Sequence, residues 1–254
     1  MEMTAISYVT GPDADPERHC LDFYRPDGGT GLPILIFAHG GVWQRGGKDQ
    51  YRNIGEAFAG RGVLTAVVNY RLTPPARHPA HAQDVARAVA WVIRHAPEYG
   101  ARPDRVFVSG HSAGGHLATL LLFDPQYLGA EGIDPESLAG VMPLSGIFDL
   151  TKPIDDTPEG GFVRHIHPPF GDDPGVLRAS SPIRHLRPTR VPLLVILAGE
   201  DYRDMRRQSE MFVGALHRHG IPTTNLIARF IEEPRAEDAG RQGSTSIPPK
   251  LEPK

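Results

Sequence analysis

One stretch constrains the fold of this chain more than any other: a short apolar run that leads into Gly-x-Ser-x-Gly. The run covers Val106 to Ser109, and residues 110–114 read Gly-His-Ser-Ala-Gly. The flanking glycines let the backbone turn sharply between a strand and a helix without Cβ clashes. Such a turn lifts the Ser112 hydroxyl to the carboxyl end of a sheet, where open α/β sheets keep their sites. We therefore predict that Ser112 is a nucleophile rather than an incidental serine in a Gly-rich connector.

The rest of the chain alternates apolar runs with amphipathic stretches. We expect strands at 5–9, 20–24, 33–37, 63–70, 106–109, 138–145, 192–198 and 225–231, and helices at 48–61, 81–99, 114–123 and 203–219. Most of the strand segments are continuously apolar, which is typical of parallel strands buried on both faces. Residues 21–24 alternate instead, which indicates a half-exposed edge strand. The order of elements predicts a doubly wound, mainly parallel α/β sheet with helices on both faces.

Two segments depart from this alternation. Residues 147–190 are rich in Pro, Gly, Asp and His and have no long apolar helical stripe, so we expect a small cap over the carboxyl end of the sheet. Residues 233–254 show no periodicity and contain four prolines. Because such a segment buries too little to offset its ordering entropy, we expect an irregular, mobile tail. Residues 1–232 should then form a single α/β domain.

Composition excludes several classes of protein. The chain has 254 residues with a formal net charge of −3, so no basic field suggests nucleic acid or a membrane surface as a partner. A single cysteine, Cys20, excludes an internal disulfide framework and fits a reducing compartment. We see no signal peptide and no apolar run long enough to span a membrane, and therefore expect a cytoplasmic protein.

Three motifs, in this order along the chain, resemble the α/β-hydrolase fold. They are His-Gly-Gly-Val-Trp at 39–43, Gly-His-Ser-Ala-Gly-Gly-His at 110–116 and Gly-Glu-Asp at 199–201. More narrowly, the chain resembles the esterase branch with an H-G-G-x-W oxyanion motif, which includes carboxylesterases and kynurenine formamidases. The resemblance covers roughly residues 20–231. It implies an α/β-hydrolase sheet, a serine mechanism on a small-molecule ester or amide, and neither a metal nor another cofactor.

Attack by a serine on an acyl carbon builds negative charge on the carbonyl oxygen, and that charge needs preorganised donors. The backbone N–H of Ala113 follows the nucleophile directly, and Gly40 and Gly41 let their amides face into a site. We predict these three residues as the oxyanion hole. The resemblance implies that Trp43 lies near the acyl pocket. We also expect His111, next to the nucleophile, in the substrate pocket.

Asp201 lies just after the strand predicted at 192–198, at the position expected of the acid in a serine–acid–histidine order. Glu200 and Asp204 are competing acids, and an aspartate just before a helix is also a common N-cap. The residue-by-residue match with the family favours Asp201 as the catalytic acid. The following segment, residues 205–212, is similar to the acid-bearing segment of formamidase-like members.

The chain departs from the family pattern at the base. A histidine should follow the last strand, yet none follows His219. We expect His217 and His219 to be solvated at a helix end. Three explanations stay open: the chain is truncated or frame-shifted after about Ile231 and lacks the closing C-terminal helix, it is a non-catalytic relative, or a cap histidine (His165 or His167) swings in. Two histidines at this spacing are too few for a metal site.

These observations favour a carboxylesterase-type serine hydrolase that cleaves small carboxylic esters through an acyl-enzyme on Ser112. We expect turnover to be weakened by the missing histidine. An aryl formamide hydrolase of the kynurenine formamidase type is one alternative. A non-catalytic binding protein built on the α/β-hydrolase fold is another.

Overall fold

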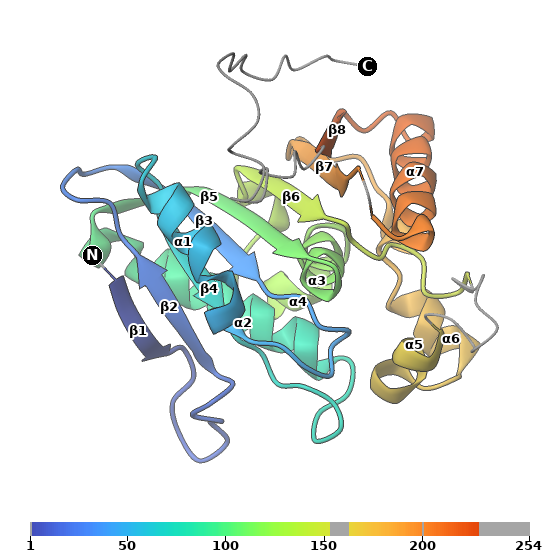
Figure 1. Ribbon diagram of the computed structural model, residues 1–254, viewed down its shortest axis with the longest axis horizontal. Helices are drawn as coiled ribbons and strands as arrows, with labels where there is room; N and C mark the ends of the chain where they lie inside the picture. The colour runs from blue at the N-terminus through green and yellow to red at the C-terminus, as the bar shows by residue number, and fades with distance from the viewer. Residues whose placement is uncertain (1, 153–162, 200, 229–254) are drawn as a thin grey trace, which may run out of the picture.

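The computed structural model describes residues 2–152, 163–199 and 201–228, and its centre is an eight-stranded sheet (Figure 1). The strands are β1 (Glu2–Ser7), β2 (Cys20–Tyr24), β3 (Leu32–Ala38), β4 (Leu64–Val68), β5 (Ala101–His111), β6 (Gly140–Leu144), β7 (Leu193–Ala198) and β8 (Thr223–Ala228). The α-helices are α1 (Arg52–Ala59), α2 (Ala80–His95), α3 (Ala113–Phe123), α4 (Pro125–Ala130), α5 (Val163–Phe170), α6 (Pro174–Ala179) and α7 (Arg203–Arg218). Short 3-10 helices cover Lys48–Tyr51 (η1), Ala96–Tyr99 (η2), Pro135–Ser137 (η3) and Pro182–His185 (η4).

The sheet is mainly parallel, as its apolar strands predict. The strand order is β1-β2-β4-β3-β5-β6-β7-β8, and every pairing from β4 through β8 is parallel. Neighbouring residues of β3 face opposite layers: Phe37 packs in a cluster with Ile54 of α1, whereas Ile36 belongs to the main core with Val85 of α2. Helices therefore cover both faces. The predicted doubly wound arrangement is confirmed.

The expected edge position of residues 21–24 is wrong. β2 lies between β1 and β4, pairs antiparallel with both, and has all five residues buried. The alternation arises because Asp22, although only 2% exposed, pairs with the ammonium group of Lys48 at 3.0 Å. A buried aspartate that pairs with a lysine of η1 thus gives β2 the alternating pattern of an exposed strand. The edge is formed by β1.

The segment predicted as a cap contains short helices rather than one long helix. Figure 1 shows α5 and α6 on the side to which the arrowheads of β5 and β6 point. The backbone N–H of His78 donates to the carbonyl of Pro169 at 2.9 Å, and His116 Nε2 hydrogen-bonds the carbonyl of Ser180 at 2.7 Å. These bonds tie the segment to the loop before α2 and to α3. Residues 153–162, and the tail expected at 233–254, lie outside the described residues.

The structure differs from the sequence prediction at one helix and at the last strand. The helix α4 was not expected; its six residues are too few to show a helical period, and it begins where the Asp124 side chain accepts the N–H of Gln126. The last strand is predicted over 225–231; β8 covers Thr223–Ala228 and thus begins two residues earlier. Residues 229–231 lie outside the described residues.

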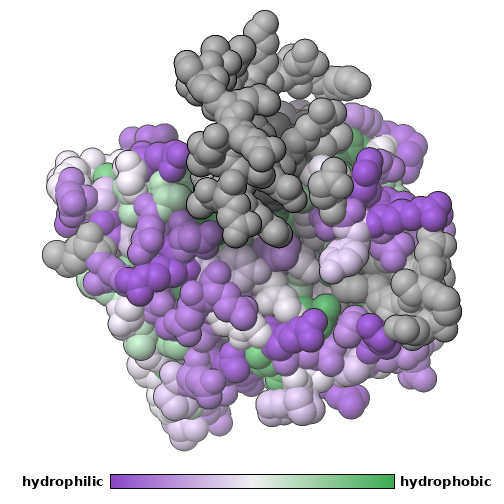
Figure 2. All heavy atoms as spheres, viewed as in Figure 1, coloured by the Kyte–Doolittle hydropathy of each residue, from purple (hydrophilic) through white to green (hydrophobic). Residues whose placement is uncertain are grey.

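The surface of the described residues carries few large apolar side chains. Figure 2 shows a face that is mostly hydrophilic, with hydrophobic residues scattered among charged ones. Val176 and Tyr202 are the large hydrophobic side chains that are exposed in the described ranges, at 37% and 84%. None of the described helices is long and apolar enough to cross a membrane.

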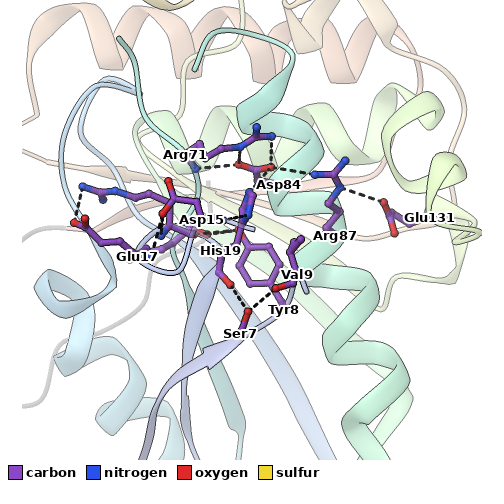
Figure 3. A network of polar contacts seen from close by, with 12 residues as sticks. Ser7, Tyr8, Val9, Asp15, Glu17, His19, Arg71, Asp84, Arg87 and Glu131 are labelled. Carbon is purple, nitrogen blue, oxygen red and sulfur yellow. Dashed lines mark hydrogen bonds and ion pairs between the residues drawn. The ribbon is translucent and has the colours of Figure 1, made fainter. Parts of the chain in front are cut away.

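A buried carboxylate joins the chain before β2 to the helix α2. Asp84 is 0% exposed and accepts from Arg71 Nε at 2.8 Å and Arg71 Nη2 at 2.7 Å (Figure 3). His19 Nε2 and Arg87 Nη1 lie 3.1 Å and 3.7 Å from the same carboxylate. Desolvating one carboxylate costs several kcal/mol, which these neighbours offset.

Replacing Asp84 by asparagine should therefore lower the free energy of unfolding by about 3–5 kcal/mol, because the partly buried guanidinium of Arg71 loses its counter-charge. Urea denaturation followed by circular dichroism measures the change. The matched control is Asp104→Asn, since Asp104 and its partner Arg102 are both exposed and the loss of an exposed ion pair should leave the free energy of unfolding almost unchanged. Equal effects of the two substitutions would contradict the role given to Asp84.

Candidate active site

The Gly-x-Ser-x-Gly stretch forms the predicted strand–turn–helix. β5 ends at His111, α3 begins at Ala113, and Ser112 between them has φ 52° and ψ −112°. A positive φ is strained for a residue with a Cβ, and such strain is common at functional sites. The turn is held by a hydrogen bond from the Ser112 N–H to the carbonyl of Leu144 at 2.9 Å. The serine is thereby fixed in an unusual backbone conformation.

The glycines of the motif allow this turn to lie directly against β3. A Cβ added at Gly114 would lie 2.0 Å from the carbonyl oxygen of Ala38, and one added at Gly110 would lie 2.5 Å from the carbonyl carbon of Gly114. Any larger residue would push the helix away from the sheet. The close packing therefore sets the height of Ser112 above the sheet.

Ser112 lies in a cavity of about 650 Å³. Its walls come from the loop after β3, from the turn itself, from β6's end, from α5 and from the start of α7. The lining residues are Gly40, Gly41, Val42, Arg45, Gly46, Gln50, Tyr51, His111, Ser112, Ser145, Arg164, His165, Asp201, Tyr202, Asp204 and Met205. The structure thus brings together Gly40, Gly41, His111, Ser112 and Asp201, which were all singled out in the sequence.

The backbone N–H groups predicted as oxyanion donors differ in their surroundings. Ala113 is the first residue of α3, and the first N–H groups of a helix have no intrahelical partner. Gly41 has φ +123°, and a Cβ there would lie 2.1 Å from the carbonyl oxygen of Arg45. The N–H of Gly40 is already engaged, because it donates to the hydroxyl of Tyr51 at 3.1 Å. The role of Gly40 in the oxyanion hole stays a prediction, with its N–H held by the Tyr51 hydroxyl in this structure.

Trp43 does not line the cavity. Its side chain is 0% exposed and makes edge-to-face contacts with the rings of His116 and Phe170, with centroids 5.1 Å and 4.8 Å apart. The indole belongs to the core that joins the loop after β3 to α3 and α5. A large aromatic ring gains more by complete burial than by facing a polar cavity. The pocket role expected from the family resemblance is not seen in this structure.

The two oxygens of the Asp201 carboxylate differ in their hydrogen bonding. Oδ1 accepts the N–H of Tyr202 at 2.9 Å, whereas Oδ2 is buried and has no hydrogen-bond partner among the described residues. The alternative role as a helix cap is not met, because α7 is preceded by Tyr202 and has no side-chain cap. Asp204 also lines the cavity, and Glu200 lies outside the described residues. Asp201 therefore offers an acceptor to a group in the cavity.

All twelve histidines of the chain lie within the described ranges, and His111 and His165 are the ones that line the cavity. Burial lowers the pKa of His111, and the charge of Asp201 opposes this effect. Burial also lowers the pKa of His165, assisted by nearby arginine charges. Both imidazoles are therefore neutral near pH 7.

The other histidines named in the sequence lie elsewhere. His167 is exposed on α5 and does not line the cavity. His217 and His219 are exposed at the end of α7, as expected. The described residues hold no cluster of three or more His, Cys, Asp or Glu side chains suited to a metal ion.

Sequence reasoning missed Tyr51, which ends η1 beside Ser112's cavity. Its hydroxyl hydrogen-bonds His111 Nδ1 at 2.8 Å, and its ring packs on Phe37 with centroids 5.1 Å apart. The only signal was its place twelve residues after His39, within a stretch that reads as an ordinary amphipathic helix. Nothing in that pattern separates a tyrosine at a site from one in a core.

The chain matches a known protein family over most of its length. The model of the BD-FAE family matches residues 21–216. This chain belongs to the BD-FAE family. The match runs along the chain from β2 to α7 and includes every residue that lines the cavity. The family resemblance inferred from the three motifs is thereby confirmed at the level of an esterase-type α/β hydrolase.

Relatives of this BD-FAE chain carry esterase and formamidase names. Esterase LipQ of Mycobacterium tuberculosis is 32% identical over 234 residues, which cover 87% of this chain and 54% of LipQ. Kynurenine formamidase of Danio rerio is 28% identical over 218 residues, covering 83% of this chain and 69% of the formamidase. The chain spans about half the length of several curated relatives it matches.

Solved structures agree on the fold. Esterase B from Lactobacillus rhamnosis superposes with a TM-score of 0.78 at 21% identity, covering 90% of this chain and 74% of the esterase. Thermogutta terrifontis esterase 2, in a form phosphonylated by sarin, gives 0.70 at 25% identity, covering 83% and 79%. The α/β-hydrolase fold of the BD-FAE chain is confirmed.

Proposed function

We propose that this BD-FAE chain is a carboxylic ester hydrolase that is acylated on Ser112. One observation carries the proposal: Ser112 stands on a strained strand–helix turn inside a cavity that also holds the buried, unpartnered Oδ2 of Asp201. Strain and an unsatisfied buried acceptor both cost stability, so their meeting in one cavity favours function. The esterase names of several relatives support the same reaction class.

The chemistry follows from the arrangement. The Ser112 oxygen attacks the ester carbonyl carbon, a C–O bond forms, and the carbonyl oxygen becomes an oxyanion. Donors at the start of α3 and in the loop after β3 stabilise that charge, each contributing about 3–4 kcal/mol in comparable sites. The tetrahedral intermediate then collapses: the C–O bond to the alkoxy group breaks, and that oxygen takes up the proton removed from Ser112 and leaves as the alcohol. Water attacks the acyl-enzyme in the same way, which releases the acid and returns the proton to Ser112.

The proton of Ser112 needs an acceptor. His165 lies on α5, lines the cavity, and is neutral near pH 7, so we propose it as the general base. No histidine bonds Asp201 Oδ2, because that oxygen has no partner in the described part of the chain, which includes every histidine. A base without its orienting carboxylate is inefficient, and removing triad members from related enzymes costs about 10⁴-fold or more. We therefore expect slow turnover.

Ser112→Ala should remove the enzymatic hydrolysis of p-nitrophenyl acetate, because alanine lacks the hydroxyl that attacks the ester. His165→Ala, made in the otherwise unchanged protein, should lower the wild-type rate of hydrolysis by about 10². The matched control is His167→Ala, two residues further on α5 but exposed and outside the cavity. Release of p-nitrophenol, corrected for the buffer rate, measures each variant. Unchanged rates in Ser112→Ala would contradict the proposal.

An aryl formamide hydrolase is a second candidate because of the likeness to the Danio rerio formamidase. Hydrolysis of N-formylkynurenine and of p-nitrophenyl acetate by the same preparation separates the two. If neither compound reacts and a non-hydrolysable ester analogue binds, the fold serves binding alone.

A further inference from the structure

The hydroxyl of Tyr51 is fixed at the wall of the Ser112 cavity. It accepts the N–H of Gly40 at 3.1 Å and hydrogen-bonds His111 Nδ1 at 2.8 Å. The Tyr51 ring rests on Phe37, which belongs to β3, the strand that runs directly into Gly40. Tyr51 and both of its polar partners line the same cavity as Ser112. The hydroxyl is therefore held by contacts on both sides rather than free to move.

The Tyr51 hydroxyl lies so close to Gly40 that no residue larger than glycine fits at that position. A Cβ added at Gly40 would lie 2.9 Å from the Tyr51 hydroxyl and 2.8 Å from His111 Nδ1. The amide expected from the sequence to face the substrate oxygen is thus covered by a side-chain hydroxyl. A hydroxyl can take over that task, because it accepts from the amide and donates its own proton onward.

The protonation states allow this relay of hydrogen bonds. Burial raises the pKa of the Tyr51 phenol and lowers the pKa of His111. Near pH 7 the phenol keeps its proton, and the imidazole is neutral with one N–H. A hydroxyl has two lone pairs and one proton. If the Gly40 N–H and the His111 Nδ1–H occupy both lone pairs, the remaining direction is that of the O–H bond.

We propose that Tyr51 is a catalytic residue of the oxyanion hole, whose O–H group donates to the carbonyl oxygen of an ester beside Ser112. This inference rests on the proposed ester hydrolysis. Gly40 then acts indirectly, because its N–H polarises the hydroxyl and strengthens the hydrogen bond that the hydroxyl donates. The proton stays on the Tyr51 oxygen throughout, so no bond of Tyr51 forms or breaks.

The test is the rate constant for acylation of Ser112 by p-nitrophenyl acetate in Tyr51→Phe. Loss of one oxyanion donor lowers such rates by about 10²–10³, and we expect that loss here with KM changed less than about threefold. Tyr99→Phe is the matched control, since Tyr99 lies in η2 and does not line the cavity. It should acylate at the wild-type rate, and the thermal midpoints of all variants should agree within a few degrees.

A structural role for Tyr51 is separated by a transition-state readout. A trifluoromethyl ketone that adds to Ser112 forms an oxyanion, so its inhibition constant should rise in Tyr51→Phe by the same factor by which kcat/KM falls. His111→Asn, which retains an N–H close to the Nδ1 position, should keep most of the rate, whereas His111→Leu should lose about tenfold.

Two results overturn the inference in distinguishable ways. If wild type is acylated and Tyr51→Phe is acylated within about threefold of the same rate, Tyr51 is not an oxyanion donor although the ester hydrolysis stands. If wild type itself is not acylated on Ser112, the proposed function falls and the inference falls with it.

Discussion

The protein should unfold when the pH falls to between about 4 and 5.5, because it buries several neutral histidines. Burial lowers the pKa of His39, His78 and His81 to about 4 and that of His116 to about 3. An unfolded chain binds these protons at about pH 6.5, so it gains protons that the folded chain excludes. Stability from these residues is therefore complete above about pH 6.5 and is lost as the pH falls toward the folded pKa values.

The expected loss of folding stability at low pH is large. Each of these histidines contributes on the order of 3 kcal/mol at neutral pH that is absent in acid, which is a large part of the stability of an ordinary domain, about 5–15 kcal/mol. Near-ultraviolet circular dichroism, which reports on the buried Trp43, would follow the transition. His116→Gln removes one buried titrating group and should move the midpoint to lower pH, whereas the exposed His217→Gln should not. A native spectrum at pH 3.5 would contradict this account.

Gly114→Ala should destroy the turn that carries Ser112. The added Cβ would meet the carbonyl oxygen of Ala38 at 2.0 Å and its carbonyl carbon at 2.6 Å, and both are backbone atoms of β3 that cannot rotate away. The helix α3 must move off the sheet, which we expect to cost about 3 kcal/mol or more and to abolish acylation.

The control for that substitution is Gly129→Ala in α4, where nothing lies within 4 Å of the added Cβ. Alanine is favoured over glycine inside a helix, so this variant should be neutral or more stable by about 0.5–1 kcal/mol. Guanidinium denaturation of both variants measures the difference. A Gly114→Ala protein as stable and as reactive as Gly129→Ala would show that the turn is not packed as described.

The order of strands and helices could be predicted because it depends on local patterns of apolar residues. The runs that became β3 to β7 are apolar enough to require burial on both faces, and Gly110 and Gly114 marked the turn around Ser112. The position of β2 could not be predicted, because Asp22 is compensated by Lys48, which lies 26 residues away along the chain. A pairing at that distance leaves no local signal.

Only those residues of the site that belong to sequence motifs could be predicted. Ser112 and Asp201 follow from motif and order, and both line the cavity. The sequence does not distinguish a wall from the core behind it, so Trp43 was expected in the pocket and is fully buried. It likewise gave no reason to place Tyr51 against Gly40, since that contact depends on how η1 packs against β3.

The central claim, that Ser112 is the nucleophile, is tested most directly by mass spectrometry of the intact protein. The chain is incubated with a fluorophosphonate, which reacts only with an activated serine, and the labelled peptide is then sequenced. We predict one added phosphonyl group, located on Ser112 and absent from Ser112→Ala. Wild-type protein that carries no label, or the same label in Ser112→Ala, would contradict the account.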